Sequence, residues 1–137
     1  MVSFLLSLHF VSGQIYVQST ATGSNDGTSW TNAYTDLNIA LQAASSGDEI
    51  WVAQGIYTPT TCSACNDSDK SIAFSIPSGV EVLGGFPSTG NPGIADRNWQ
   101  TNPTTLSGDI DGDGTSANNS YSIVRTIDVN NLSLIHI

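Results

Sequence analysis

The sequence contains very few basic residues. Three lysine and arginine side chains stand against twelve acidic side chains, so the 137-residue chain has a formal net charge of -9. Nucleic acids and anionic membrane surfaces are bound by clustered lysine and arginine. The charge balance therefore argues against nucleic acid and an anionic membrane as partners. It suits a divalent cation or a neutral carbohydrate better.

Histidine is also scarce, and the first of two histidines lies in an apolar N-terminal run. Residues 2–13 read VSFLLSLHFVSG, which is uncharged and has the length of a secretory h-region, although a basic n-region is missing. We expect residues 1–13 to be a signal peptide cleaved near Gly13, and we expect no membrane span in the mature body. A buried first strand is the alternative interpretation.

The second histidine lies in the last six residues, LSLIHI at 132–137, which resemble the translation of a sequencing-library adapter. We interpret them as a non-native tail and residues 14–131 as a truncated fragment; an ordinary apolar closing strand is the alternative. With His9 and His136 set aside, the body has no histidine. It therefore cannot hold a Ser-His-Asp triad, a Cys-His pair or a histidine-ligated zinc.

Cysteine is limited to Cys62 and Cys65, which form one C-x-x-C motif. A four-cysteine zinc site needs a second pair, and a thioredoxin-like motif needs a strand-to-helix context rather than the polar sequence around this one. In an exported protein, we expect a small disulfide that closes a loop.

The rest of the chain alternates short apolar stretches with glycine, serine, threonine, asparagine and aspartate, which is typical of many short strands joined by turns. One helix is predicted over residues 36–44, capped by Thr35 or Asp36 and followed by a C-terminal glycine at Gly47. Its apolar stripe has the spacing i, i+3, i+4 and i+7 and consists of Leu37, Ala40, Leu41 and Ala44.

The strands recur at intervals that favour a solenoid. Equivalent apolar positions at Val52, Val82 and Leu106 are about one supersecondary repeat apart, and no Asn-Gly or Asp-Gly hairpin turn joins neighbouring strands outside the acidic loop. We therefore predict a mainly β protein, the opening coils of a right-handed parallel β-helix. The open first coil would expose strand edges and bare core, and the helix over residues 36–44 is placed to cap it.

Several stretches resemble the N-terminal region of bacterial surface proteins with right-handed parallel β-helix repeats, which are similar to polymorphic outer-membrane proteins and belong to the pectin-lyase-like group. The resemblance runs from Ile15 to about Val129, and its most specific parts are DGTSW at residues 26–30, GDEIWVAQGIY at 47–57 and GVEVLGGF at 79–86. It implies a protein that is secreted or held at the bacterial cell surface or outer membrane, with further coils and a C-terminal sorting domain.

The resemblance implies a non-catalytic function for this part of the chain. We expect the N-terminal cap and first coils of an adhesive or carbohydrate-contacting protein, with extracellular polysaccharide or cell-surface glycans as partners. Three tryptophans can be sugar platforms or core, and core is the usual role of aromatic residues beside a cap helix; they are Trp30, Trp51 and Trp99.

The loop LSGDIDGDGTSANNS, residues 106–120, carries the clearest candidate site. Asp109, Asp111 and Asp113 followed by glycine match the first half of a calcium loop, D-x-D-x-D-G, in which hard oxygen ligands two residues apart converge on one Ca²⁺ ion. Position twelve is Ser120 rather than glutamate, and no flanking helices are predicted, so the loop is not an EF-hand. Thr115, Asn118, Asn119 or water would complete the shell; a solvated polar turn is the alternative.

Two other functions stay open. The chain can be the start of a calcium-dependent polysaccharide lyase, in which the ion acidifies a proton that a base removes. Arg125 is the base-like residue nearest the aspartates, but arginine stays protonated, and we assign no catalytic residue within the fragment. A free-standing calcium-binding module is the third possibility.

Overall fold

The structure is a computed structural model that describes residues 12–60, 70–126 and 134–136. These residues form eight strands, one α-helix and one short 3-10 helix. In chain order the elements are β1 (Gln14–Val17), α1 (Leu37–Ala43), β2 (Glu49–Ala53), β3 (Gly55–Tyr57), β4 (Phe74–Ile76), β5 (Glu81–Phe86), η1 (Ile94–Asp96), β6 (Thr104–Leu106), β7 (Val124–Thr126) and β8 (Leu134–His136).

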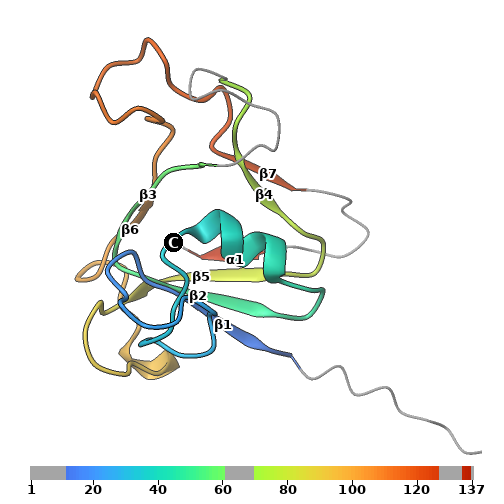
Figure 1. The fold of residues 1–137 in the computed structure, drawn as a ribbon, viewed down its shortest axis with the longest axis vertical. Helices are drawn as coiled ribbons and strands as arrows, with labels where there is room; N and C mark the ends of the chain where they lie inside the picture. Colours follow the sequence, from blue (N-terminus) through green and yellow to red (C-terminus); the bar gives the residue numbers. More distant parts are fainter. Residues whose placement is uncertain (1–11, 61–69, 127–133, 137) are drawn as a thin grey trace, which may run out of the picture.

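The strands pair in parallel and form three small sheets. The largest has the order β1-β2-β5-β8, while β3 pairs with β6 and β4 pairs with β7. From β2 onward the chain visits the large sheet, the β3 sheet and the β4 sheet in that order, and then repeats the order. In Figure 1 the three sheets surround α1. The β-helix stays a prediction, because small open parallel sheets also occur in other folds.

The parallel register places apolar side chains beside one another on the inner face of the large sheet. Ile15 pairs with Ile50 and Ile50 with Val82, and the alternation of a strand points all three the same way. Side chains from β3 and β4 join the same cluster, so the three sheets share one interior. Its buried members are Val17, Leu37, Ala40, Leu41, Ile50, Val52, Tyr57, Phe74, Ile76, Val80 and Val82.

The structure confirms the predicted apolar stripe of helix α1 and corrects the predicted end of the helix. Asp36 caps it, because a side-chain oxygen of Asp36 accepts a hydrogen bond from the backbone nitrogen of Asn38 at 2.7 Å. The helix ends at Ala43, and Ala44 is already extended, so Gly47 is not the C-terminal glycine that we expected. Gly47 has a φ of 99° and instead turns the chain toward β2, where its backbone nitrogen donates to Gly79.

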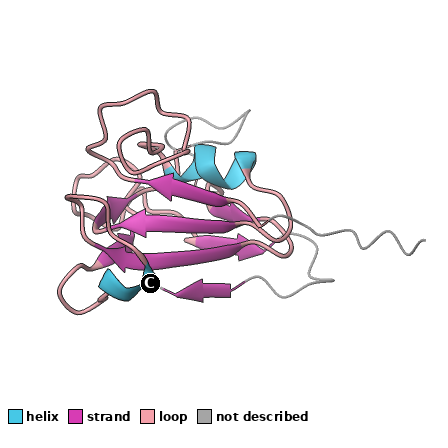
Figure 2. Ribbon diagram, turned by 90° about the horizontal axis from the view of Figure 1, so that it is seen from below, coloured by secondary structure: helices cyan, strands magenta, loops and turns pink. Residues whose placement is uncertain are grey.

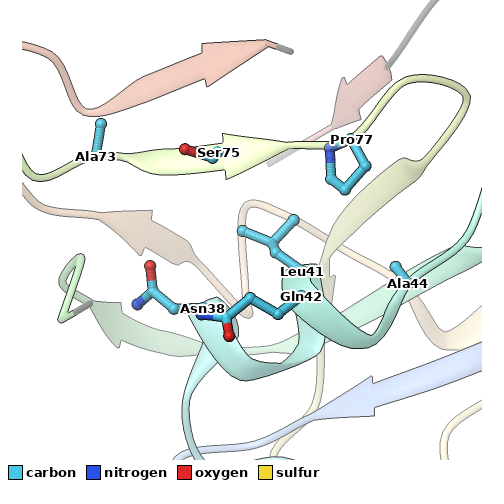
Figure 3. Close-up of a pocket in the computed structure, with 7 residues that line it drawn as sticks. All are labelled: Asn38, Leu41, Gln42, Ala44, Ala73, Ser75 and Pro77. Carbon is cyan, nitrogen blue, oxygen red and sulfur yellow. The ribbon is translucent and has the colours of Figure 1, made fainter. Parts of the chain in front are cut away.

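Helix α1 packs on the interior at one end of the stacked strands, against β1, β2 and β4. Figure 2 shows it at this end of the stack. The side of the helix toward β4 leaves a hollow of about 330 Å³ (Figure 3). The residues that line the hollow are Asn38, Leu41, Gln42, Ala44, Ala73, Ser75 and Pro77.

The outer face of the large sheet carries a second, aromatic cluster. Trp51 stacks on Phe86 with ring centroids 4.8 Å apart, and Tyr16 meets Trp30 edge-on at 4.9 Å. The indole nitrogen of Trp30 donates to the backbone oxygen of Pro92 at 2.8 Å, which joins the two loops that cover this face. Trp30 and Trp51 are therefore core, as we expected, although loops rather than α1 cover them.

The third tryptophan does not belong to either cluster. The side chain of Trp99 is 65% exposed, but its backbone lies close against β5. At Gly85, an added Cβ atom would come within 3.0 Å of the Trp99 nitrogen, and φ at Gly85 is 91°. The oxygen of Gly85 also accepts a hydrogen bond from the backbone nitrogen of Asn98 at 2.7 Å. A glycine at this position lets the covering loop approach the sheet.

We predict that Gly85→Ala destabilises the protein by about 2–4 kcal/mol, because it combines a strained φ with a backbone clash. Gly90→Ala is the matched control: Gly90 has a φ of 78°, but nothing lies within 4 Å of an added Cβ. The control should therefore lose only about 1 kcal/mol. Urea unfolding of both variants measures the difference, and equal losses would show that the clash with the loop does not exist.

Candidate metal centre

The acidic loop connects β6 to β7 and extends away from the sheets (Figure 1). Its base is closed by two backbone hydrogen bonds, from Ser120 to Gly108 at 2.8 Å and from Tyr121 to Lys70 at 2.8 Å. The hydroxyl of Ser120 lies within hydrogen-bond distance of two backbone oxygens, those of Ile72 and Ser122, and has one proton to donate. Ser120, which occupies position twelve of the motif, therefore fastens the base of the loop.

The structure brings the three predicted aspartates together. Asp109, Asp111 and Asp113 each offer one carboxylate oxygen, and these oxygens lie within 4.8 Å of one another. Glycines with φ of 68° and 72° alternate with them and reverse the chain, as the motif requires; they are Gly112 and Gly114.

Local donors hold two of the carboxylates in place. The backbone nitrogen and hydroxyl of Thr115 bond to the two oxygens of Asp113 at 2.7 and 3.0 Å. The side-chain nitrogen of Asn118 donates to Asp111 at 2.9 Å. Thr115 and Asn118, which we expected to be further ligands, thus support the carboxylates with their donor groups.

Asp109 differs from its two neighbours because it is partly buried. One carboxylate oxygen, Oδ2, accepts a hydrogen bond from the backbone nitrogen of Gly114 at 3.1 Å. The other, Oδ1, is buried and has no hydrogen-bond partner among the described residues, and the same holds for Oδ1 of Asn119. A carboxylate oxygen removed from water without a donor is costly, and a cation is the partner that such an oxygen favours.

The pKa of Asp111 is lowered from its ordinary value, chiefly because the Asn118 amide stabilises the charged carboxylate. The same contact favours the charged form of the Asp111 carboxyl, which is the form that binds a cation. The spacing in the sequence predicted that the three carboxylates converge. It did not predict that Asn118 donates a hydrogen bond to Asp111, because any asparagine nearby in the sequence could do so equally well.

Arg125, considered above as a base, is exposed on β7 and pairs with Ser75 of β4 in the strand register. It lies on the strand that follows the loop, outside the group of three carboxylates. The C-x-x-C cysteines, Cys62 and Cys65, lie outside the described residues, as do His9 and most of the predicted signal peptide. Among the described helices, none has the length and apolar character needed to cross a membrane.

Comparisons of the chain with family models, curated proteins and solved structures gave no match. The resemblance to β-helix surface proteins therefore stays a prediction that depends on the sequence motifs.

We predict that Asn118→Ala raises the pKa of Asp111 back toward the ordinary value, because the largest cause of the shift is removed. A carbon-detected NMR titration of the carboxyl groups measures this directly. Because a lowered pKa stabilises the folded state only above it, the stability difference between variant and parent should disappear as pH falls through the pKa of Asp111.

The internal control for this titration is Asp26. Its pKa is also lowered, by the hydroxyls of Ser24 and Thr28 in a different loop. The pKa of Asp26 should not change in Asn118→Ala. An unchanged pKa of Asp111 would mean that the Asn118 contact is not formed in solution.

Proposed function

We propose that the chain is the N-terminal cap and opening coils of a right-handed parallel β-helix, and that its role in an exported surface protein is structural rather than catalytic. The observation that carries the proposal is the position of α1, which packs on the shared interior at one end of parallel, in-register strands. The repeated order in which the chain visits the three sheets supports it.

The end of a parallel stack needs a cover for two physical reasons. A first strand whose outer edge is unpaired promotes edge-to-edge association, and the first layer of core side chains has no further layer above it. In β1 the loop before α1 pairs this edge, because Tyr16 exchanges backbone hydrogen bonds with Gly27 and Tyr34. The layer of core side chains is therefore what α1 covers. Leu37, Ala40 and Leu41 of α1 supply apolar side chains to that layer and are at most 3% exposed. The helix thus takes the place of a preceding coil.

A small polar network fixes the start of this cap to the chain that follows β3. The side-chain nitrogen of Asn38, which is 4% exposed, donates to Asp36 at 2.8 Å and to the hydroxyl of Thr60 at 3.1 Å. Thr60 in turn donates to the other oxygen of Asp36. The network satisfies the buried polar groups, so the helix is held in one position.

We predict that Leu41→Asp opens the cap, because it places a charge in the interior cluster at a cost of about 3 kcal/mol or more. Ile39→Asp is the matched control on the same helix, since Ile39 is 39% exposed. Leu41→Asp should lower the urea midpoint, bind the dye ANS and self-associate in light scattering, whereas Ile39→Asp should remain monomeric. Equal behaviour of the two variants would reject a capping role for α1.

The surface role agrees with the net charge of -9 and the scarcity of basic residues. Such a surface repels nucleic acid and anionic lipid and tolerates neutral glycans. The proposal includes export, adhesion and contact with glycans because the sequence motifs resemble those of β-helix surface proteins. No observation on the described residues favours the polysaccharide lyase over this structural role.

A second candidate function, binding of a divalent cation by the acidic loop, is favoured by the buried oxygen of Asp109. We propose Ca²⁺ as the ion because the donor set is made of hard carboxylate oxygens. Asp109, Asp111 and Asp113 would hold it, and the ion would stabilise the loop between β6 and β7 by reducing the repulsion among the three charges.

We predict that CaCl₂ at about ten times Kd stabilises the full chain by about 1.4 kcal/mol, with Kd in the range of about 0.1–1 mM for an extracellular site. Thermal unfolding with CaCl₂, compared with NaCl of equal ionic strength, measures the effect. The double variant Asp111→Asn/Asp113→Asn should lose it, while Asp96→Asn, which removes a charge on η1, should keep it. No shift at millimolar calcium would remove the ion from the proposal.

A further inference from the structure

A groove of about 500 Å³ lies on the outer surface beside β3 and β6. One wall comes from the loop after β1, another from the corner between β2 and β3, and a third from the two ends of the loop between β5 and β6. The described residues that line it are Ser19, Thr20, Gln54, Gly55, Ile56, Ser88, Pro103 and Thr105. A smaller hollow of about 190 Å³ shares Thr20 and Ser88 with it and extends toward Trp30.

The described lining of both hollows contains no charged side chain, although the chain carries a net charge of -9. Its polar groups are hydroxyls and side-chain amides, which both donate and accept hydrogen bonds. A charged ligand is normally held by a side chain of opposite charge, and an anion would in addition be repelled by the acidic protein. The lining therefore favours a neutral ligand that carries both donors and acceptors.

The groove also contains an exposed apolar strip. Ile56 is 71% exposed on the outer face of β3, and Thr105 of β6 is its partner in the strand register. An exposed isoleucine surrounded by hydroxyl groups matches a ligand with an apolar face and a polar rim. A pyranose ring has this character, since its C–H bonds form a face and its hydroxyls form the edge.

Hydrogen bonds between successive turns of the chain fix the groove walls. The side-chain nitrogen of Gln54 donates to the hydroxyl of Ser88 at 2.9 Å. The backbone nitrogen of Gly55 donates to the oxygen of Pro103 at 3.1 Å. A site whose walls are held before the ligand arrives loses less conformational freedom on binding.

We infer that this groove binds a neutral saccharide, with Ile56 under the ring and Gln54, Ser88 and Thr105 at its hydroxyls. The inference deepens the glycan contact of the proposed function and rests on it. It names a site away from both the cap helix and the acidic loop.

The test is a titration of the isotope-labelled full chain, followed by amide shifts in NMR. Cellobiose, xylobiose, mannobiose and lactose are added separately to about 50 mM, enough to detect millimolar binding, and digalacturonate serves as the charged comparison. At least one neutral disaccharide should shift the amides of Gly55, Ile56, Ser88 and Thr105, and digalacturonate should bind more weakly.

Two variants test the location of the site. Thr105→Trp fills the groove and should weaken binding more than about tenfold, while Gln54→Ala should weaken it about threefold by removing one polar partner. Thr101→Trp is the control, because Thr101 is exposed on the adjacent loop outside the lining. All three spectra should remain those of the folded parent; if Thr105→Trp does not fold, Gln54→Ala decides.

Absence of shifts with every neutral disaccharide, shifts confined to another surface, or tighter binding of digalacturonate would overturn the inference. None of these outcomes touches the capping role, which is judged by the pair Leu41→Asp and Ile39→Asp without any sugar. If Leu41→Asp and Ile39→Asp behave alike while a neutral disaccharide binds in the groove, the proposed function is rejected and the groove remains a binding site.

Discussion

The parallel, in-register pairing of β1, β2 and β5 is the constraint on which the rest of the structure depends. It brings Ile15, Ile50 and Val82 together on one face of the sheet, and the alternation of the strand necessarily aligns Tyr16, Trp51 and Leu83 on the other. Both faces are therefore apolar, and each requires a cover. The interior face is closed by the other sheets and by α1 at the end. The outer face is covered by two long loops, which are joined by the hydrogen bond from Trp30 to Pro92.

This two-sided burial explains why β2 and β5 read as nearly continuous apolar runs, a pattern more typical of parallel sheets than of half-exposed strands. It also gives the loops a packing role. The loop from β1 to α1 contributes Trp30, and the loop from β5 to β6 receives its indole hydrogen bond at Pro92 and approaches the sheet at Gly85. The same two loops supply Ser19, Thr20, Ser88 and Pro103 to the groove near β3.

The features that could be predicted from the sequence are the local ones. The 3.6-residue stripe identified α1 within one residue at each end, and the spacing of two between Asp109, Asp111 and Asp113 was enough to predict that the carboxylates converge. Contacts between residues far apart in the sequence could not be predicted in this way. The cover over Trp51 depends on loops far away in the chain, and the groove joins residues near positions 19, 54, 88 and 105. Gly47 was misassigned because a glycine after a helix has the same local signal whether it ends the helix or turns toward the next strand.

Helix α1 and the acidic loop depend on different interactions. Helix α1 buries Leu37, Ala40 and Leu41 in the interior cluster, so its contribution to stability scales with the apolar area that it buries. The acidic loop lies between β6 and β7, and its base is joined to β4, one of the strands on which α1 packs, by the β4–β7 ladder. Hydrogen bonds to Lys70 and Ile72 join it to the residues just before β4. Donors from Thr115 and Asn118 satisfy two of the carboxylates, whereas one oxygen of Asp109 is buried without a hydrogen-bond partner among the described residues. A cation held by the three carboxylates, as we propose, would bind the folded loop, so its binding would add to the stability that the interior provides.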